Sequence, residues 1–310
     1  MRCSVCLLTT LLVVAAPLRA ADPPPAAPPP PVPAAEPLVP AELKALVERQ
    51  RALLAKADKA AGQEGVEELR PDFQKLVVDY EQFLKDYPAV AAGYVSYALL
   101  LSRPVLGERE RAARLLLKAN ELDPDQPLVK NQLGNYLAED GKPLQAVNYY
   151  LAAIRLVPGE PLYHYQLGTL LAAARDDFLE SGEWKRPVLD DAMQEAFRQA
   201  MTLAPDNLEY AIAYGKSFYE LERPDWAEAL KFWRALELKT KTPLMQQTIH
   251  LYEARVLLKQ GRFDEARALI AMVDDPRLAQ DKQALSADPA VPAEPASANI
   301  TVPAVGGPAK

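Results

Sequence analysis

The side chains best suited to chemistry in this sequence are two histidines, His164 and His250, and two pairs of adjacent acids. A zinc site built on one helix needs two histidines four residues apart, and neither histidine has such a neighbour. The acid pairs, Asp176–Asp177 and Asp190–Asp191, have the composition of metal ligands or general acids. Consecutive helical residues point about 100° apart, so neither pair converges on one ion unaided. These patterns predict no metal site and no catalytic group.

Signatures of other enzyme classes are also missing from the 310 residues. The chain has no G-x-S-x-G motif, no glycine-rich phosphate loop and no dinucleotide fingerprint. Its formal net charge is −7 and it has no basic cluster. Nucleic acids and anionic membranes bind basic surfaces, so both are disfavoured as partners. We predict no enzymatic activity and no cofactor; an enzyme with an unrecognised site is the least favoured alternative.

The N-terminus has the pattern of an export signal. Arg2 gives a positive start, an apolar run covers residues 5–16, and cleavage is expected after Ala20. The run is too short to span a bilayer comfortably. Neither Cys3 nor Cys6 follows the apolar run, so neither can be the acylated cysteine of a lipoprotein. We therefore expect a periplasmic or secreted protein with no stable membrane anchor.

Beyond residue 40 the composition favours helices, because glycine is scarce, with 13 in the chain, and Ala, Leu, Glu and Arg are abundant. Small residues, turn glycines and helix-ending prolines recur 34 residues apart: Gly107 and Gly141, Ala112 and Ala146, Ala119 and Ala153, Pro124 and Pro158, Gly134 and Gly168. A period of this length is typical of solenoids, in which each helix pair buries its apolar face against its neighbours.

The unit at 127–160 resembles the tetratricopeptide repeat (TPR) family. It contains the pair Leu133–Gly134, then Ala146 four residues before Tyr150, and the closing Pro158, as the family pattern requires. The resemblance implies an all-α, right-handed α-solenoid of stacked antiparallel helix pairs. Small residues such as Gly134 are expected to let paired helices approach closely, with Tyr150 filling the adjoining gap.

The chain therefore divides into a signal peptide at 1–20, a Pro/Ala-rich linker at 21–40, a degenerate helix pair at 41–92, a TPR array at 93–280 and a disordered Ala/Pro-rich tail at 281–310. The expected repeats are 93–126, 127–160, 161–207, 208–242 and 243–276. The third repeat contains an insertion at 172–192, interpreted as lengthened helices with a turn at Ser181–Gly182 and Pro187. Such insertions often serve binding; alternatively, Phe178 and Trp184 only cap a neighbouring repeat.

The resemblance implies that first helices line a concave groove that binds a peptide or a helix of another protein. Helical phase places these residues opposite the core: Tyr97, Leu101, Asn131, Asn135, Tyr165, Thr169, Lys216, Tyr219 and Arg255. Asn131 and Asn135, four residues apart, share a face and could bond a peptide backbone or simply be exposed polar residues. No basic cluster for a C-terminal carboxylate is evident. We predict a scaffold or adaptor in the bacterial cell envelope; a self-associating structural component is the alternative.

Overall fold

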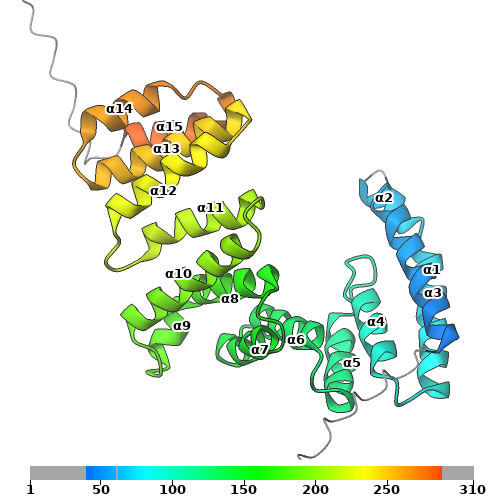
Figure 1. Cartoon of the computed structure of the whole chain (residues 1–310). Helices are drawn as coiled ribbons and strands as arrows, with labels where there is room; N and C mark the ends of the chain where they lie inside the picture. The colour runs from blue at the N-terminus through cyan, green and yellow to red at the C-terminus, as the bar shows by residue number, and fades with distance from the viewer. Residues whose placement is uncertain (1–39, 61, 288–310) are drawn as a thin grey trace, which may run out of the picture. The chain divides into compact units, whose positions relative to one another are not determined.

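The computed structural model describes residues 40–60 and 62–287, and within that part every regular element is a helix (Figure 1). The N-terminal helices are α1 Ala41–Ala57, α2 Gly62–Glu67, α3 Arg70–Asp86, α4 Ala91–Leu101, α5 Arg109–Leu122, α6 Pro127–Glu139 and α7 Pro143–Leu156. They are followed by α8 Pro161–Ala173, α9 Arg175–Glu180, α10 Arg186–Leu203, α11 Leu208–Ser217, α12 Trp226–Lys239, α13 Pro243–Lys259, α14 Phe263–Ala271 and α15 Ala279–Ser286. Single 3₁₀ turns occupy Phe218–Glu220 and Pro276–Leu278.

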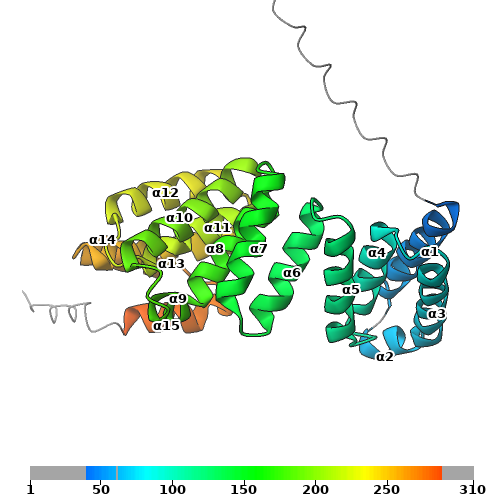
Figure 2. The same cartoon turned by 90° about the horizontal axis from the view of Figure 1, so that it is seen from below.

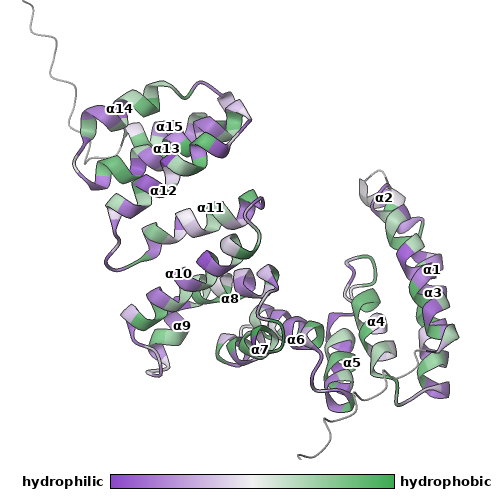
Figure 3. Cartoon of the chain, in the orientation of Figure 1, coloured by the Kyte–Doolittle hydropathy of each residue, from purple (hydrophilic) through white to green (hydrophobic). Residues whose placement is uncertain are grey.

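Consecutive helices pack as antiparallel pairs: α4 with α5, α6 with α7, α8 with α10, α11 with α12, and α13 with α14 (Figures 1 and 2). Each pair stacks on the next through the contacts α5–α6, α7–α8, α10–α11 and α12–α13. Green and purple residues alternate along the helices in Figure 3, because each helix buries only one apolar face. The predicted all-α array of stacked helix pairs is confirmed. No helix in the described ranges is long and apolar enough to cross a membrane.

Local sequence sets where these helices begin and end. Proline occupies the first turn of α6, α7, α8 and α13, where its missing N–H has no cost. The Asp225 Oδ1 caps α12 by accepting from the backbone N–H groups of Ala227 and Glu228 at 2.9 and 3.0 Å. Gly141 ends α6 with a φ of 69°. The N–H groups of Gly141 and Lys142 then donate to the carbonyls of Ala138 and Leu137, the pattern of a Schellman motif.

Glycines on the first helices allow close contact with large rings on the second helices. A Cβ added to Gly134 would lie 2.8 Å from the Tyr150 ring, and one added to Gly168 would lie 2.9 Å from the Phe197 ring. Ala146 is fully buried in the same α6–α7 pair. The predicted role of Gly134 and Tyr150 in helix packing is thus what the structure shows.

The pair expected at 41–92 contains α1 and α3 with the short α2 between them. Leu43, Leu46, Phe73 and Leu76 are buried between the two long helices. The Tyr80 hydroxyl donates to the buried Gln50 Oε1 at 2.6 Å. Since α3 and α1 also contact α4, this pair continues directly into the array.

The insertion differs from its expected form. The second helix, α10, is lengthened to 18 residues, and the turn at Ser181–Gly182 is present. The first helix is not lengthened: α8 ends at Ala173 and a separate helix, α9, follows. Pro187 lies in the first turn of α10 and not in the preceding turn, because proline fits the start of a helix well. Phe178 is fully buried, and its ring packs edge-on with the Trp184 ring, with centroids 5.4 Å apart. Both belong to an apolar cluster that also contains Ala146, Val147 and Tyr150 of α7, so the inserted segment packs against the preceding repeat as well as its own.

The expected tail begins later than predicted, because residues 279–286 form α15. Leu278 and Leu285, seven residues apart, are buried against α13 and α14. The Lys282 ammonium donates to the Val273 carbonyl at 2.6 Å. The signal peptide, residues 21–39 of the linker and residues 288–310 of the tail lie outside the described residues.

Candidate partner-binding groove

Three of the candidate residues are buried and cannot line an open groove. Tyr97 is 1% exposed, and its ring stacks on Tyr80 of α3 with centroids 5.4 Å apart. Leu101 is fully buried in the same apolar cluster. The prediction of exposure is wrong for both residues because α1 and α3 cover this face of α4, as helical phase alone does not reveal.

Asn131 is also fully buried, which contradicts its predicted exposure. Neither its Oδ1 nor its Nδ2 has a hydrogen-bond partner among residues 40–60 and 62–287. A buried amide without partners costs about 1–3 kcal/mol. Asn131 therefore contributes no group to a bound peptide in this structure.

Substituting Asn131 by leucine should therefore raise the free energy of unfolding, by about 1 kcal/mol, because it removes two buried polar atoms. Asn135→Leu is the matched control four residues on, where Oδ1 accepts from the Tyr150 hydroxyl at 2.7 Å; it should lower stability by a similar amount. Urea unfolding of both variants measures the two changes. A less stable Asn131→Leu would mean that the amide is hydrogen-bonded.

Three other candidates, Asn135 of α6 and Tyr165 and Thr169 of α8, lie together around one groove of about 460 Å³. Its other polar side chains are Glu139, Gln166 and Asp177. Its apolar walls are Ala138, Pro143, Tyr150, Leu170, Ala173 and Ala174. The groove thus joins the α6–α7 pair, α8 and the inserted helix α9.

Hydrogen bonds within the protein hold the hydroxyl groups of this groove. Besides the Tyr150–Asn135 bond, Tyr165 donates to Glu209 Oε1 at 2.9 Å and Thr169 donates to the Tyr165 carbonyl at 2.9 Å. Burial raises the pKa of Tyr150, and burial together with Glu209 raises the pKa of Tyr165. Both phenols are protonated at neutral pH, so the hydrogen bonds of Tyr150 to Asn135 and of Tyr165 to Glu209 persist and hold these side chains in position.

The last three candidates lie outside this groove. Lys216 and Arg255 are exposed. The Arg255 guanidinium lies over the Tyr219 ring at 5.6 Å from its centroid, and the Tyr219 hydroxyl donates to the Tyr252 carbonyl at 2.8 Å. Tyr219 and Arg255 thus lie together on the α11–α13 segment, and no contact joins them or Lys216 to Asn135 and Tyr165.

No protein-family model matches the chain, and no curated protein matches its sequence. Among solved structures, YrrB, described as a TPR protein with an unusual peptide-binding site, aligns with a TM-score of 0.55 at 17% identity over 67% of this chain and 97% of its own. PilF of Pseudomonas aeruginosa aligns with a TM-score of 0.50 at 18% identity, over 77% of this chain and 99% of its own. PilW, a widely conserved type IV pilus biogenesis factor, aligns with a TM-score of 0.50 at 12% identity, over 79% of this chain and 96% of its own. The chain has the TPR fold.

In this TPR array, α6 and α8 are the first helices of consecutive repeats, and the groove lies between them. Asn135, Tyr165 and Thr169, which helical phase predicts to lie opposite the core, lie together there. Helical phase did not identify Gln166, or Asp177, which reaches the groove only because α9 packs against α7 and α8. In the sequence, Asp177 stands out only as one of a pair of acids with Asp176.

The two histidines occupy structural positions in the TPR fold. The ring Nε2 of His164 lies 2.8 Å from the Pro158 carbonyl oxygen. His250 is buried, with Nε2 2.7 Å from Glu237 Oε1. No group of three or more His, Cys, Asp or Glu residues within the described ranges is arranged to hold a metal ion.

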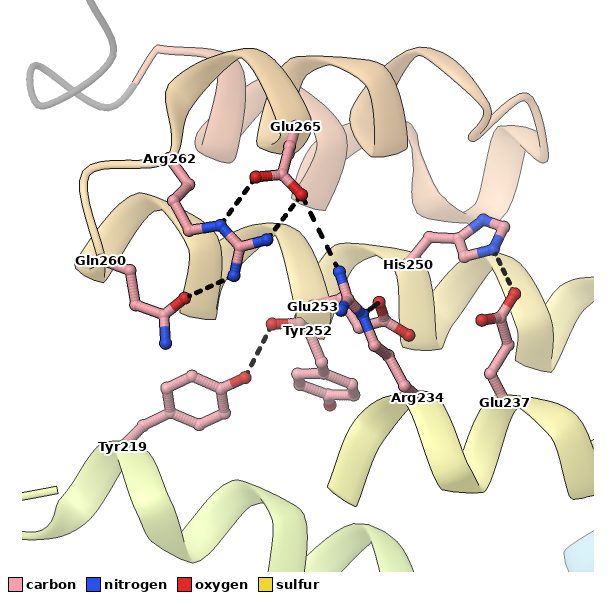
Figure 4. Close-up of polar contacts among 9 residues, drawn as sticks. All are labelled: Tyr219, Arg234, Glu237, His250, Tyr252, Glu253, Gln260, Arg262 and Glu265. Atoms are coloured by element: carbon pink, nitrogen blue, oxygen red, sulfur yellow. Dashed lines mark hydrogen bonds and ion pairs between the residues drawn. The ribbon is translucent and has the colours of Figure 1, made fainter. Parts of the chain in front are cut away.

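A buried acid, Glu253, lies close to His250 in the last repeats (Figure 4). Glu253 of α13 is 2% exposed, and its Oε2 is 3.6 Å from the Arg234 Nε of α12. Its Oε1 has no hydrogen-bond partner in the part of the chain that the structure describes. Burial, reinforced by the charge of Glu237, raises the pKa of Glu253 to about 7. This cluster lies on other helices than the groove.

Proposed function

We propose that this chain is a non-catalytic protein-interaction scaffold that binds a peptide or a helix of a partner protein in the groove between α6 and α8. The observation that carries the proposal is the groove itself, in which Asn135, Tyr165 and Thr169 gather above apolar walls. Its volume of about 460 Å³ lies in the range of small-ligand sites and suits a few side chains of a peptide. YrrB, which shares the fold, is described as having a peptide-binding site.

Amide groups in the groove suit a peptide backbone. The Nδ2 of Asn135 makes no hydrogen bond to any described residue, while its Oδ1 is fixed by Tyr150. Gln166 presents a second amide one residue from Tyr165. Amides can pair with backbone N–H and C=O groups whatever the side chains of the peptide. Backbone pairing would hold the ligand, and the walls would select its side chains.

Location in the bacterial cell envelope is part of this proposal. It rests on the positive start, the apolar run and the cleavage pattern of residues 1–20. The N-terminal sequence of the protein recovered from cells tests it, and Ala21 is the expected first residue. An intact Met1 would contradict export by this signal.

The binding role is tested by filling the groove. Ala173 is exposed on its wall, so Ala173→Trp should occlude it and lower the affinity of groove-bound peptides about tenfold or more. Peptides are first selected from a random displayed library on the immobilised full chain, and their affinities are then measured by calorimetry.

Leu238→Trp is the matched control, because Leu238 of α12 is 88% exposed and does not line the groove. It should leave the same affinities unchanged. If the library yields no binder, or if every binder tolerates Ala173→Trp, the groove is not the binding site.

A further inference from the structure

The groove carries negative charge that the protein does not neutralise. Its charged lining residues are Glu139 and Asp177, and no lysine, arginine or histidine lines it. Glu139 is paired with Arg109 at 2.7 Å. Asp177 is exposed, and its carboxylate makes no hydrogen bond or ion pair with the described residues.

The cations nearest in sequence to these carboxylates are engaged elsewhere. Arg175, two residues before Asp177, pairs with Glu220 at 3.0 Å. Lys142, beside the groove residues Gly141 and Pro143, pairs with Asp140 at 2.7 Å. Asp177 is therefore a lining carboxylate that no described cation pairs with, and it is available to a ligand.

The hydroxyl groups of the groove offer no free proton to an anionic ligand, because Tyr150, Tyr165 and Thr169 already donate within the protein. A ligand that brings its own hydrogen-bond donors therefore suits these side chains better than an anionic one that needs them.

We propose that the groove selects a partner segment carrying a lysine or arginine side chain, whose cationic end is bound by Asp177. This inference rests on the proposed function and names the class of its partner. Lysine and arginine have only donors at their ends and an apolar stem that packs along apolar surface. Ala138, Leu170 and Ala174 provide such surface beside Asp177 and Gln166.

The inserted helix thereby acquires a role in specificity. Without α9 the groove would contain no unpaired carboxylate, since Glu139 is neutralised by Arg109. An exposed ion pair contributes modestly, so replacing the basic side chain by norleucine should weaken binding roughly two- to fivefold.

The experiment is selection from a random displayed peptide library on the full chain and three variants. Lysine and arginine should be enriched among wild-type binders, lose their enrichment with Asp177→Asn, and give way to Asp and Glu with Asp177→Lys. Asp176→Asn is the matched control: it removes the same charge one residue away, where the side chain is exposed and does not line the groove. It should keep the basic enrichment.

The same selection separates this inference from the proposed function. Two results would overturn the basic segment and leave the groove as the binding site. In the first, binders weakened by Ala173→Trp show no enrichment in lysine or arginine. In the second, they show that enrichment, and Asp177→Asn leaves it unchanged. An absence of any binder weakened by Ala173→Trp would overturn both. Thermal unfolding followed by circular dichroism confirms that each variant is folded, as expected for substitutions at exposed positions.

Discussion

Replacing Gly215 by valine should destabilise the C-terminal repeats by about 3 kcal/mol or more, because no space exists for a side chain there. A Cβ at this position would lie 2.4 Å from the Trp233 ring and 2.7 Å from Phe232. Trp233 cannot retreat easily: it is fully buried and stacks on Tyr252 with centroids 4.4 Å apart. Urea unfolding followed by tryptophan fluorescence measures the loss.

Gly159→Ala provides the matched control. A Cβ at Gly159 would meet no atom within 4 Å, and its backbone lies outside the left-handed region. This substitution should change the free energy of unfolding by less than about 0.5 kcal/mol. Equal unfolding midpoints for Gly215→Val and the wild type would show that α11 and α12 are not packed as closely as the structure indicates.

The fold could be predicted because its determinants repeat. The α6–α7 and α8–α10 pairs each place a glycine against a large ring, and the 34-residue spacing of Gly134 and Gly168 shows this requirement in the sequence. The end of α6 could also be predicted from the sequence, because only glycine readily adopts the φ of 69° found at Gly141. Helix boundaries and pairing therefore follow from local sequence together with the period.

The groove was only partly predictable because helical phase describes one helix at a time. Asn135 and Thr169 line the groove, since both lie on the open side of their own helices. Helical phase failed for Tyr97, Leu101 and Asn131, where packing with other helices decides exposure. The apolar character of Leu101 was a usable warning. Asp177 could not be placed, because its position depends on how an inserted helix packs against two others.

The tail shows the same limit in a simpler form. Residues 281–310 are rich in Ala and Pro and lack an apolar stripe, so the sequence indicates disorder. In the structure, Leu278 and Leu285 are buried against α13 and α14, and Lys282 bonds the Val273 carbonyl, so α15 is docked there. A short helix with few apolar residues can be stabilised in this way, because packing on an apolar surface that is already formed replaces an extended stripe of its own.

The buried Glu253 should make the C-terminal repeats less stable as the pH rises through 7. Its pKa is raised from 4.5 to about 7 by burial, so between these values the folded protein binds a proton that the unfolded chain has lost. The contribution of Glu253 is thus fully present below pH 4.5 and is lost as the pH passes 7. Arg234, Glu237, His250 and Glu265 are the charged or titratable groups around it on α12, α13 and α14 (Figure 4).

Glu253→Gln should therefore stabilise the protein at pH 8, by about 2–3 kcal/mol, and leave its stability nearly unchanged at pH 4.5. Glutamine keeps the shape and cannot ionise, so the buried charge is removed. Comparing variant with wild type at each pH cancels the contribution of His250 and the other titrating groups. Glu228→Gln removes the same charge from a half-exposed side chain of α12 and should show no such dependence. Urea unfolding from pH 4.5 to 8.5 gives both curves, and a difference that does not grow with pH would mean that Glu253 ionises freely in the folded protein.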